Sequence, residues 1–186
     1  PPRSPLFPYT TLFRSRALVV MATGMGKTFV AAESLRRIKA NNPKLRVLVC
    51  AHTNDLVYQL ERAFWSFMQP AERTIVLNSH EPLPKDSLDS YDYVFACVDS
   101  AASYLRNAMD TPQFDILVVD ECHHVAAYSF ENVLKAVRSK YVYGLTATPT
   151  RKDGWHKIIY MQCGDIRVRV SNKELKQNKE MEHTVI

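Results

Sequence analysis

The feature that most constrains this chain is a glycine-bearing segment between a strand-like run and a helix-like run. Residues 22–28 read Ala-Thr-Gly-Met-Gly-Lys-Thr and directly follow the apolar run from Ala17 to Met21. The residues that follow carry apolar side chains at the spacing of one helix face, at Phe29, Ala32, Leu35 and Ile38. Glycines let the backbone curl tightly, and the start of a helix offers unpaired N–H groups, so the pattern predicts a phosphate-binding loop.

Two side chains of this loop have ligand chemistry of their own. The ammonium group of Lys27 can reach the terminal phosphates of a nucleotide, and the hydroxyl of Thr28 can ligate Mg²⁺. The rest of the phosphate cradle is expected at Thr23, Gly24, Met25 and Gly26. The longest form of such a loop would have a glycine at the position of Met21, which this chain lacks.

Apolar runs and helical patterns alternate from residue 16 to about residue 150. Helices are expected at 27–40, 55–68, 100–108 and 129–139, and strands at 17–21, 45–51, 74–77, 93–98, 116–119 and 141–145. Two shorter apolar runs, 158–161 and 166–170, are also expected to be strands. This alternation predicts an α/β fold with a parallel sheet covered by helices on both faces.

An acidic pair, Asp120 and Glu121, follows the apolar run that ends at Val119. Ligands of α/β sheets bind at the carboxyl ends of the strands. A phosphate-bound Mg²⁺ needs a carboxylate, for which Asp120 is suited, and the attacking water needs a base or an orienting group, for which Glu121 is suited. Taken alone, such a pair is also compatible with a solvated turn. A zinc site at Cys122, His123 and His124 is disfavoured because no second cluster of ligands follows at a recognised spacing.

Charge, hydropathy and cysteine usage exclude some classes of protein. The net charge is +5, but two of these charges come from Arg3 and Arg14, within residues 1–15, which are expected to be non-native. The net charge therefore gives only weak support for a polyanionic partner. No apolar run is long enough to span a membrane. The four cysteines form no CxxC pair, and reduced core thiols in a cytoplasmic protein are expected.

Four motifs together resemble those of one protein family. Asp120-Glu121-Cys122-His123 resembles the DEAH-type box of superfamily 2 helicases, and residues 144–149 (GLTATP) resemble the motif that follows it. Residues 22–28 are similar to the first motif of that family, and residues 48–60 are loosely similar to the next one. The order and spacing agree with the family over residues 16–170.

The resemblance implies a RecA-like P-loop NTPase domain, the first of two in a motor that uses ATP and Mg²⁺. Lys27, Asp120 and Glu121 would be catalytic, with Thr28 and Asp120 as the Mg²⁺ ligands. Hydrolysis would be coupled to movement through His123, Thr146 and Thr148. Nucleic acid would be contacted through Thr53, Asn54 and Gln59, although helix capping before Leu56 explains Thr53 and Asn54 equally well.

The resemblance also sets expectations for domains and partners. Residues 6–15 (LFPYTTLFRS) resemble a translated sequencing adapter, so residues 1–15 are expected to be non-native. Residues 16–170 would be the ATP-binding domain, and residues 171–186 the start of a linker to a second RecA-like domain in cis. The expected partner is nucleic acid, with DNA favoured over RNA. Three alternatives remain open: the motor subunit of a restriction or repair complex, an ATP-binding switch or assembly protein without motor action, and a non-functional relic or misassembled read.

Overall fold

The computed structural model describes residues 16–78, 87–107, 113–125, 127–137, 139–148 and 156–170. The segments 1–15 and 171–186, which the sequence sets apart, lie outside the described residues. The elements in chain order are β1 (Arg16–Met21), α1 (Lys27–Asn41), β2 (Val47–Ala51), α2 (Asn54–Trp65), β3 (Thr74–Leu77), the 3-10 turn η2 (Leu88–Ser90), β4 (Tyr93–Cys97), α3 (Val98–Asn107), β5 (Ile116–Val119), α4 (Ala127–Val137), β6 (Tyr141–Thr146), α5 (His156–Cys163) and β7 (Ile166–Val170).

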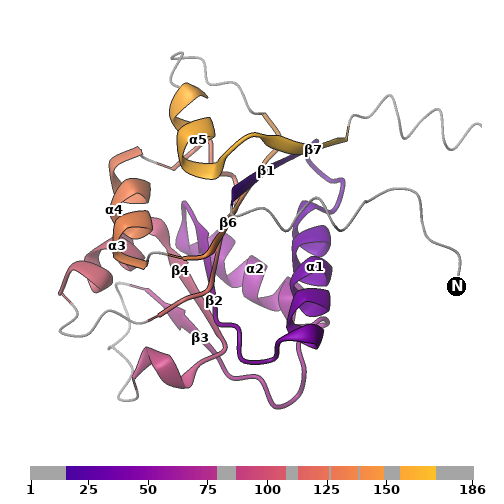
Figure 1. The fold of residues 1–186 in the computed structure, drawn as a ribbon, viewed down its shortest axis with the longest axis vertical. Helices are drawn as coiled ribbons and strands as arrows, with labels where there is room; N and C mark the ends of the chain where they lie inside the picture. The colour runs from indigo at the N-terminus through magenta and orange to yellow at the C-terminus, as the bar shows by residue number, and fades with distance from the viewer. Residues whose placement is uncertain are drawn as a thin grey trace, which may run out of the picture.

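The strands form one seven-stranded sheet in the order β3-β4-β2-β5-β6-β1-β7 (Figure 1). Every pair is parallel. Although β1 comes first in the chain, it lies between β6 and β7, where Val20 is in register with Thr146. The predicted fold class, a RecA-like parallel sheet, is therefore confirmed.

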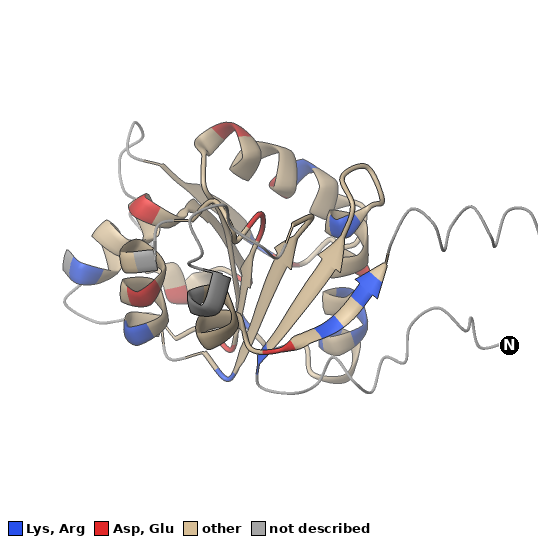
Figure 2. Cartoon of the chain, turned by 90° about the horizontal axis from the view of Figure 1, so that it is seen from above, with Lys and Arg blue, Asp and Glu red and all other residues tan. Residues whose placement is uncertain are grey.

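Helices cover both faces of the sheet, because alternate side chains of each strand need apolar cover on opposite sides. Ala17, Val19 and Met21 pack with residues of α1 and α2, whereas Leu18 and Val20 pack with residues of α3, α4 and α5. Figure 1 shows these two groups of helices on either side of the sheet. Charged side chains lie mainly on the helices and at the edge strand β7, and the inner strands are nearly free of them (Figure 2).

Two expectations from the sequence are wrong in detail. Residues 158–161 are not a strand but part of α5, in which Ile159 and Cys163 are buried one helical turn apart. A short apolar run does not distinguish a strand from a buried helix turn, which is why the pattern misled here. Phe29 does not join the buried face of α1: it is 57% exposed and packs edge-on against Phe67, with ring centroids 5.6 Å apart.

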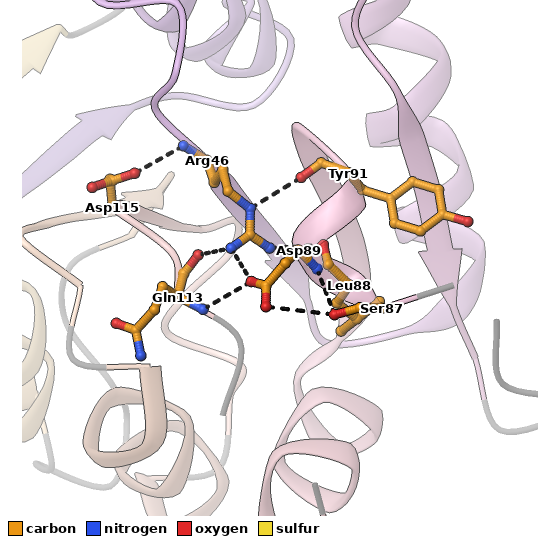
Figure 3. A network of polar contacts seen from close by, with 7 residues as sticks. All are labelled: Arg46, Ser87, Leu88, Asp89, Tyr91, Gln113 and Asp115. Carbon is orange, nitrogen blue, oxygen red and sulfur yellow. Dashed lines mark hydrogen bonds and ion pairs between the residues drawn. The ribbon is translucent and has the colours of Figure 1, made fainter. Parts of the chain in front are cut away.

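A network around Arg46 holds the amino ends of the central strands together (Figure 3). Arg46 precedes β2, and its backbone N–H donates to the carboxylate of Asp115, just before β5, at 3.0 Å. Its guanidinium donates to the backbone oxygens of Leu88, Tyr91 and Gln113 and to the carboxylate of Asp89. One side chain thus connects three loops at the edge of the sheet opposite the motifs, which lie at the carboxyl ends.

All four cysteines are buried and free of disulfides, as expected for core thiols. Among the described residues, no helix is both long and apolar enough to cross a membrane.

Candidate functional site at the carboxyl edge of the sheet

The predicted motifs meet at one edge of the sheet. Since all strands run in the same direction, their carboxyl ends lie together, and ligands of such folds bind there. The phosphate loop leaves β1, the acidic pair leaves β5, and Thr146 ends β6. These strands are neighbours in the order β5-β6-β1, so segments up to 124 residues apart in the sequence converge.

The phosphate loop has the backbone conformation that its glycines permit. Gly24 and Gly26 adopt left-handed φ angles of 81° and 77°, which side chains of L-residues rarely adopt. The turn is closed by a hydrogen bond from Met25 N–H to the carbonyl of Ala22, at 3.2 Å. Helix α1 begins at Lys27 with no acidic residue in its first turn and no side-chain cap. Its N-terminal amides therefore face the loop with the positive end of the helix dipole.

The acidic pair turns back towards this loop. The backbone N–H of Asp120 bonds the carbonyl of Cys50 at 2.8 Å, and its Oδ1 accepts the N–H of Glu121 at 2.9 Å. Glu121 has a left-handed φ of 44°, unusual for a residue with a side chain. Its Oε1 lies 3.0 Å from Nζ of Lys27, and the two side chains are 21% and 8% exposed. Lys27 and Glu121, which lie 94 residues apart in the sequence, therefore form an ion pair.

The carboxyl group of Asp120 is buried, and this changes its chemistry. Burial raises its pKa, the neighbouring Glu121 raises it further, and the hydrogen bond from Glu121 N–H and the charge of Lys27 oppose the rise. A cation close to this carboxylate would offset the cost of its charge. That is the setting in which a buried carboxylate takes part in binding a metal ion.

His123 connects the acidic pair to β6. Its Nδ1 lies 2.8 Å from Oγ1 of Thr146, which is fully buried. The same Oγ1 accepts the backbone N–H of Thr148 at 3.1 Å, so the three predicted coupling residues are in contact. Oε2 of Glu121 lies 3.4 Å from Nδ1 of His123 but without hydrogen-bond geometry, because Nδ1 faces Thr146. Burial and the adjacent His124 lower the pKa of His123, which favours the neutral imidazole.

The residues predicted to contact nucleic acid lie at the start of α2. Thr53 is the N-cap of that helix, and its Oγ1 accepts the N–H of Leu56 at 3.4 Å, so the capping role is confirmed. Asn54 is the first helical residue, and its buried Oδ1 has no hydrogen-bond partner among the described residues. Gln59 lies further along α2 with an exposed side chain.

Sequence reasoning missed one group at this edge. The ring of His52, which directly follows β2, lies 4.9 Å from the ring of His124, centroid to centroid. His124 in turn lies 3.9 Å from the ring of His123. The three histidines follow β2 and β5, which are adjacent in the sheet. The strand order brings them together, and no spacing in the sequence reveals it.

The chain is similar in sequence to known restriction-enzyme and translocase proteins. The family described as "Type III restriction enzyme, res subunit" matches residues 12–151. The "DNA 3'-5' translocase XPB2" of Sulfurisphaera tokodaii is 29% identical over 88% of this chain and 34% of that protein. The "Type I restriction enzyme EcoAI endonuclease subunit" of Escherichia coli is 30% identical over 73% of this chain and 17% of that protein.

A solved structure shows the same fold. The helicase domain of Hef from Pyrococcus furiosus superposes with a TM-score of 0.71 at 20% identity, covering 87% of this chain and 35% of that one. The chain thus spans about a third or less of the length of each of these three proteins. It belongs to the Type III restriction enzyme res subunit family, within the superfamily 2 helicases, and is their N-terminal RecA-like domain.

Proposed function

We propose that this chain is the ATP-binding domain of an ATP-dependent helicase or translocase that acts on nucleic acid, with DNA favoured over RNA. The observation that carries the proposal is the ion pair between Lys27 and Glu121, 3.0 Å apart beside a loop built for phosphate. One partner is suited to binding the γ-phosphate and the other to orienting the water that attacks it. Both therefore lie within reach of one reacting group.

The loop residues 23–28 would bind the phosphates through backbone amides and the Lys27 ammonium. Mg²⁺ would be held by the hydroxyl of Thr28 and, directly or through water, by Asp120. No group of three or more potential protein ligands for a metal ion occurs among the described residues. Mg²⁺ bound with a nucleotide typically takes one or two protein ligands and completes its shell with phosphate oxygens and water.

The contacts among His123, Thr146 and Thr148 favour a motor over a simple ATP-dependent switch. They extend from Glu121 to the end of β6, and a change at the γ-phosphate would reach the loop after β6 through them. Thr53, Asn54 and Gln59 would contact the nucleic-acid backbone, which suits a protein that ignores base identity. A second RecA-like domain in cis, following residues 171–186, would complete the ATP site.

The motor subunit of a restriction complex is the second candidate. The family description and the E. coli restriction subunit both favour it. Such a motor translocates on duplex DNA without needing to separate the strands. The two candidates share the same ATP chemistry and differ in what the rest of the protein does.

Equilibrium binding of an ATP analogue tests the shared proposal. The chain is expected to bind a non-hydrolysable fluorescent ATP analogue in the presence of Mg²⁺, and Lys27→Ala should weaken binding by at least tenfold. A matched control is Lys135→Ala, which removes an exposed lysine paired with Glu131 on α4. If Lys27→Ala and Lys135→Ala bind the analogue equally well, the nucleotide does not use this loop.

Slow hydrolysis is expected from the isolated chain. An arginine supplied by a second domain is typically worth about 10³–10⁵ in rate. Vigorous ATP hydrolysis by the chain alone, stimulated by nucleic acid, would contradict the need for a second domain. Comparing single-stranded and duplex oligonucleotides of DNA and RNA as binding partners would test the preference for DNA.

A further inference from the structure

The three histidines form a continuous contact between the acidic pair and the start of α2. His123 contacts Thr146 and lies near Glu121, as described above. From there the ring centroids are 3.9 Å apart to His124 and a further 4.9 Å apart to His52, with interplanar angles of 42° and 36°. His52 directly precedes Thr53, the N-cap of α2. A displacement of the turn at residues 120–124 that carries the acidic pair, the acidic turn, can therefore reach the cap of that helix through contacting side chains.

The side chain of His52 contacts His124 through its ring. Its Nδ1 is buried without a hydrogen-bond partner among the described residues. Burial, followed by the neighbouring His124, lowers the pKa of His52, and the charge of Glu121 opposes this. A neutral imidazole can stack on another imidazole, whereas two protonated rings would repel each other. The lowered pKa of His52 favours its neutral form, which packs against a neighbouring ring without charge repulsion.

Two simpler explanations for the contacts among His52, His123 and His124 are a metal centre and ordinary core packing, and both fit the structure poorly. The histidines are not a metal centre, since no suitable group of three ligands occurs in the part of the chain that the structure describes. They are not ordinary core packing either, because His124 is exposed and His52 and His123 are only partly buried. Side chains at the rim of the ATP site that contact one another across two loops are placed to transmit a change of position.

We propose that His52 and His124 are positioning residues that couple the nucleotide site to the segment 53–59, so that ATP binding changes the affinity of that segment for nucleic acid. The inference rests on the proposed function, because it requires one ligand at residues 22–28 and another at 53–59. Neither histidine needs to touch ATP. The tilted rings, which contact one another, transmit movement of the acidic turn to the N-cap of α2.

The coupling is measured as a ratio of two affinities. The Kd of a non-hydrolysable fluorescent ATP analogue is determined with Mg²⁺, with and without a saturating single-stranded DNA oligonucleotide. Coupling between two sites is typically worth about 5–150-fold and is the same whichever ligand is varied. The unmodified chain is expected to show a ratio of about fivefold or more.

Alanine variants remove the ring contact. His52→Ala and His124→Ala should each bring the ratio below about twofold, while the Kd without oligonucleotide stays within about twofold of the parent value. The double variant should lose no more than either single variant, because both act through the same contact. Tyr128→Ala is the control: its ring is 71% exposed on α4, and its removal should leave the ratio unchanged.

Phenylalanine variants test whether a ring alone is sufficient. His52→Phe and His124→Phe keep a flat side chain without titratable nitrogens and should restore the ratio to within about twofold of the parent. If an alanine variant does not fold, His52→Gln and His124→Gln remove the ring while keeping a polar side chain, and they should also lose coupling.

The inference is overturned if the folded alanine or glutamine variants keep the parent ratio, or if the parent shows no coupling although it binds both ligands. It is also overturned if the phenylalanine variants behave like alanine. Failure of the parent chain to bind the ATP analogue or the oligonucleotide is a different result: it contradicts the proposed function itself, and the inference then falls with it.

Discussion

Replacing Glu121 by glutamine should make ATP bind more tightly and be hydrolysed more slowly. Oε1 of Glu121 lies 3.0 Å from Nζ of Lys27, in a position that the γ-phosphate is expected to take. In the proposed site, the γ-phosphate must therefore displace the Glu121 carboxylate from Lys27. The negative charge of that carboxylate would then remain close to the phosphate and repel it. Glu121→Gln keeps the shape of the side chain and removes both obstacles.

The size of the effect follows from how buried the pair is. Exposed ion pairs are worth about 0–1 kcal/mol, and removing one partner of a fully buried pair costs about 3–5 kcal/mol. With Lys27 at 8% and Glu121 at 21% exposure, this pair lies between those limits. A competing interaction of about 1.5 kcal/mol corresponds to a roughly tenfold tighter Kd in the variant. Loss of a group that orients or activates water should slow hydrolysis by about 10²–10⁴-fold.

Calorimetric titration with a non-hydrolysable ATP analogue and Mg²⁺ measures the affinity, and single-turnover hydrolysis measures the rate. Glu131→Gln provides the matched control, because it makes the same chemical change in the exposed Glu131–Lys135 pair on α4. That control should alter neither quantity. An unchanged or weaker affinity in Glu121→Gln would show that the carboxylate does not compete with the nucleotide for Lys27.

Three further predictions concern stability. In Gly144→Ala the new Cβ would lie 2.5 Å from Sγ of Cys163, so thermal unfolding should reveal a loss of about 1–3 kcal/mol; a neutral result would mean that α5 can move away from β6. Arg46→Lys removes the planar guanidinium that bonds both the segment 88–91 and Gln113, and it should cost about 2 kcal/mol in urea unfolding; equal stability would show that the network of Figure 3 makes no net contribution to stability. Because the pKa values of His52 and His123 are lowered from 6.5 in the fold, the unfolded chain binds more protons, and the free energy of unfolding should fall as pH decreases below about 6.5. His52→Phe should flatten that dependence, and an identical pH profile in the variant would contradict the assignment.

Local patterns in the sequence predicted most of the sheet and the centre of the site. Strand–helix alternation predicted the parallel sheet, and the glycine loop and acidic pair predicted which residues meet at its carboxyl edge. These signals are strong because phosphate binding restricts both residue type and spacing. The contact between Lys27 and Glu121 then follows from the parallel arrangement of β1 and β5.

Contacts that depend on which strands are neighbours in the sheet could not be predicted from the sequence. The contact between His52 and His124 requires β2 to lie beside β5, and sequence periodicity does not specify that order. Phe29 illustrates a second limit: its spacing matches the buried face of α1, yet the helix turns this position towards Phe67. Residues 158–161, which lie in α5, illustrate a third limit. A short apolar run is compatible with either a strand or a buried helix turn, and the sequence alone does not distinguish them.

The position of β1 within the sheet has a consequence for how the protein is made. Of the described strands it is synthesised before the others, yet its two neighbours, β6 and β7, lie at residues 141–146 and 166–170. The phosphate loop therefore begins on a strand that stays unpaired until nearly all the described chain has been synthesised. Sheets with such distant pairings form slowly, and their exposed intermediates are prone to aggregation. ATP binding at this loop, as proposed, would therefore follow the synthesis of β6 and β7, and ATP would stabilise only chains in which these strands are already in place.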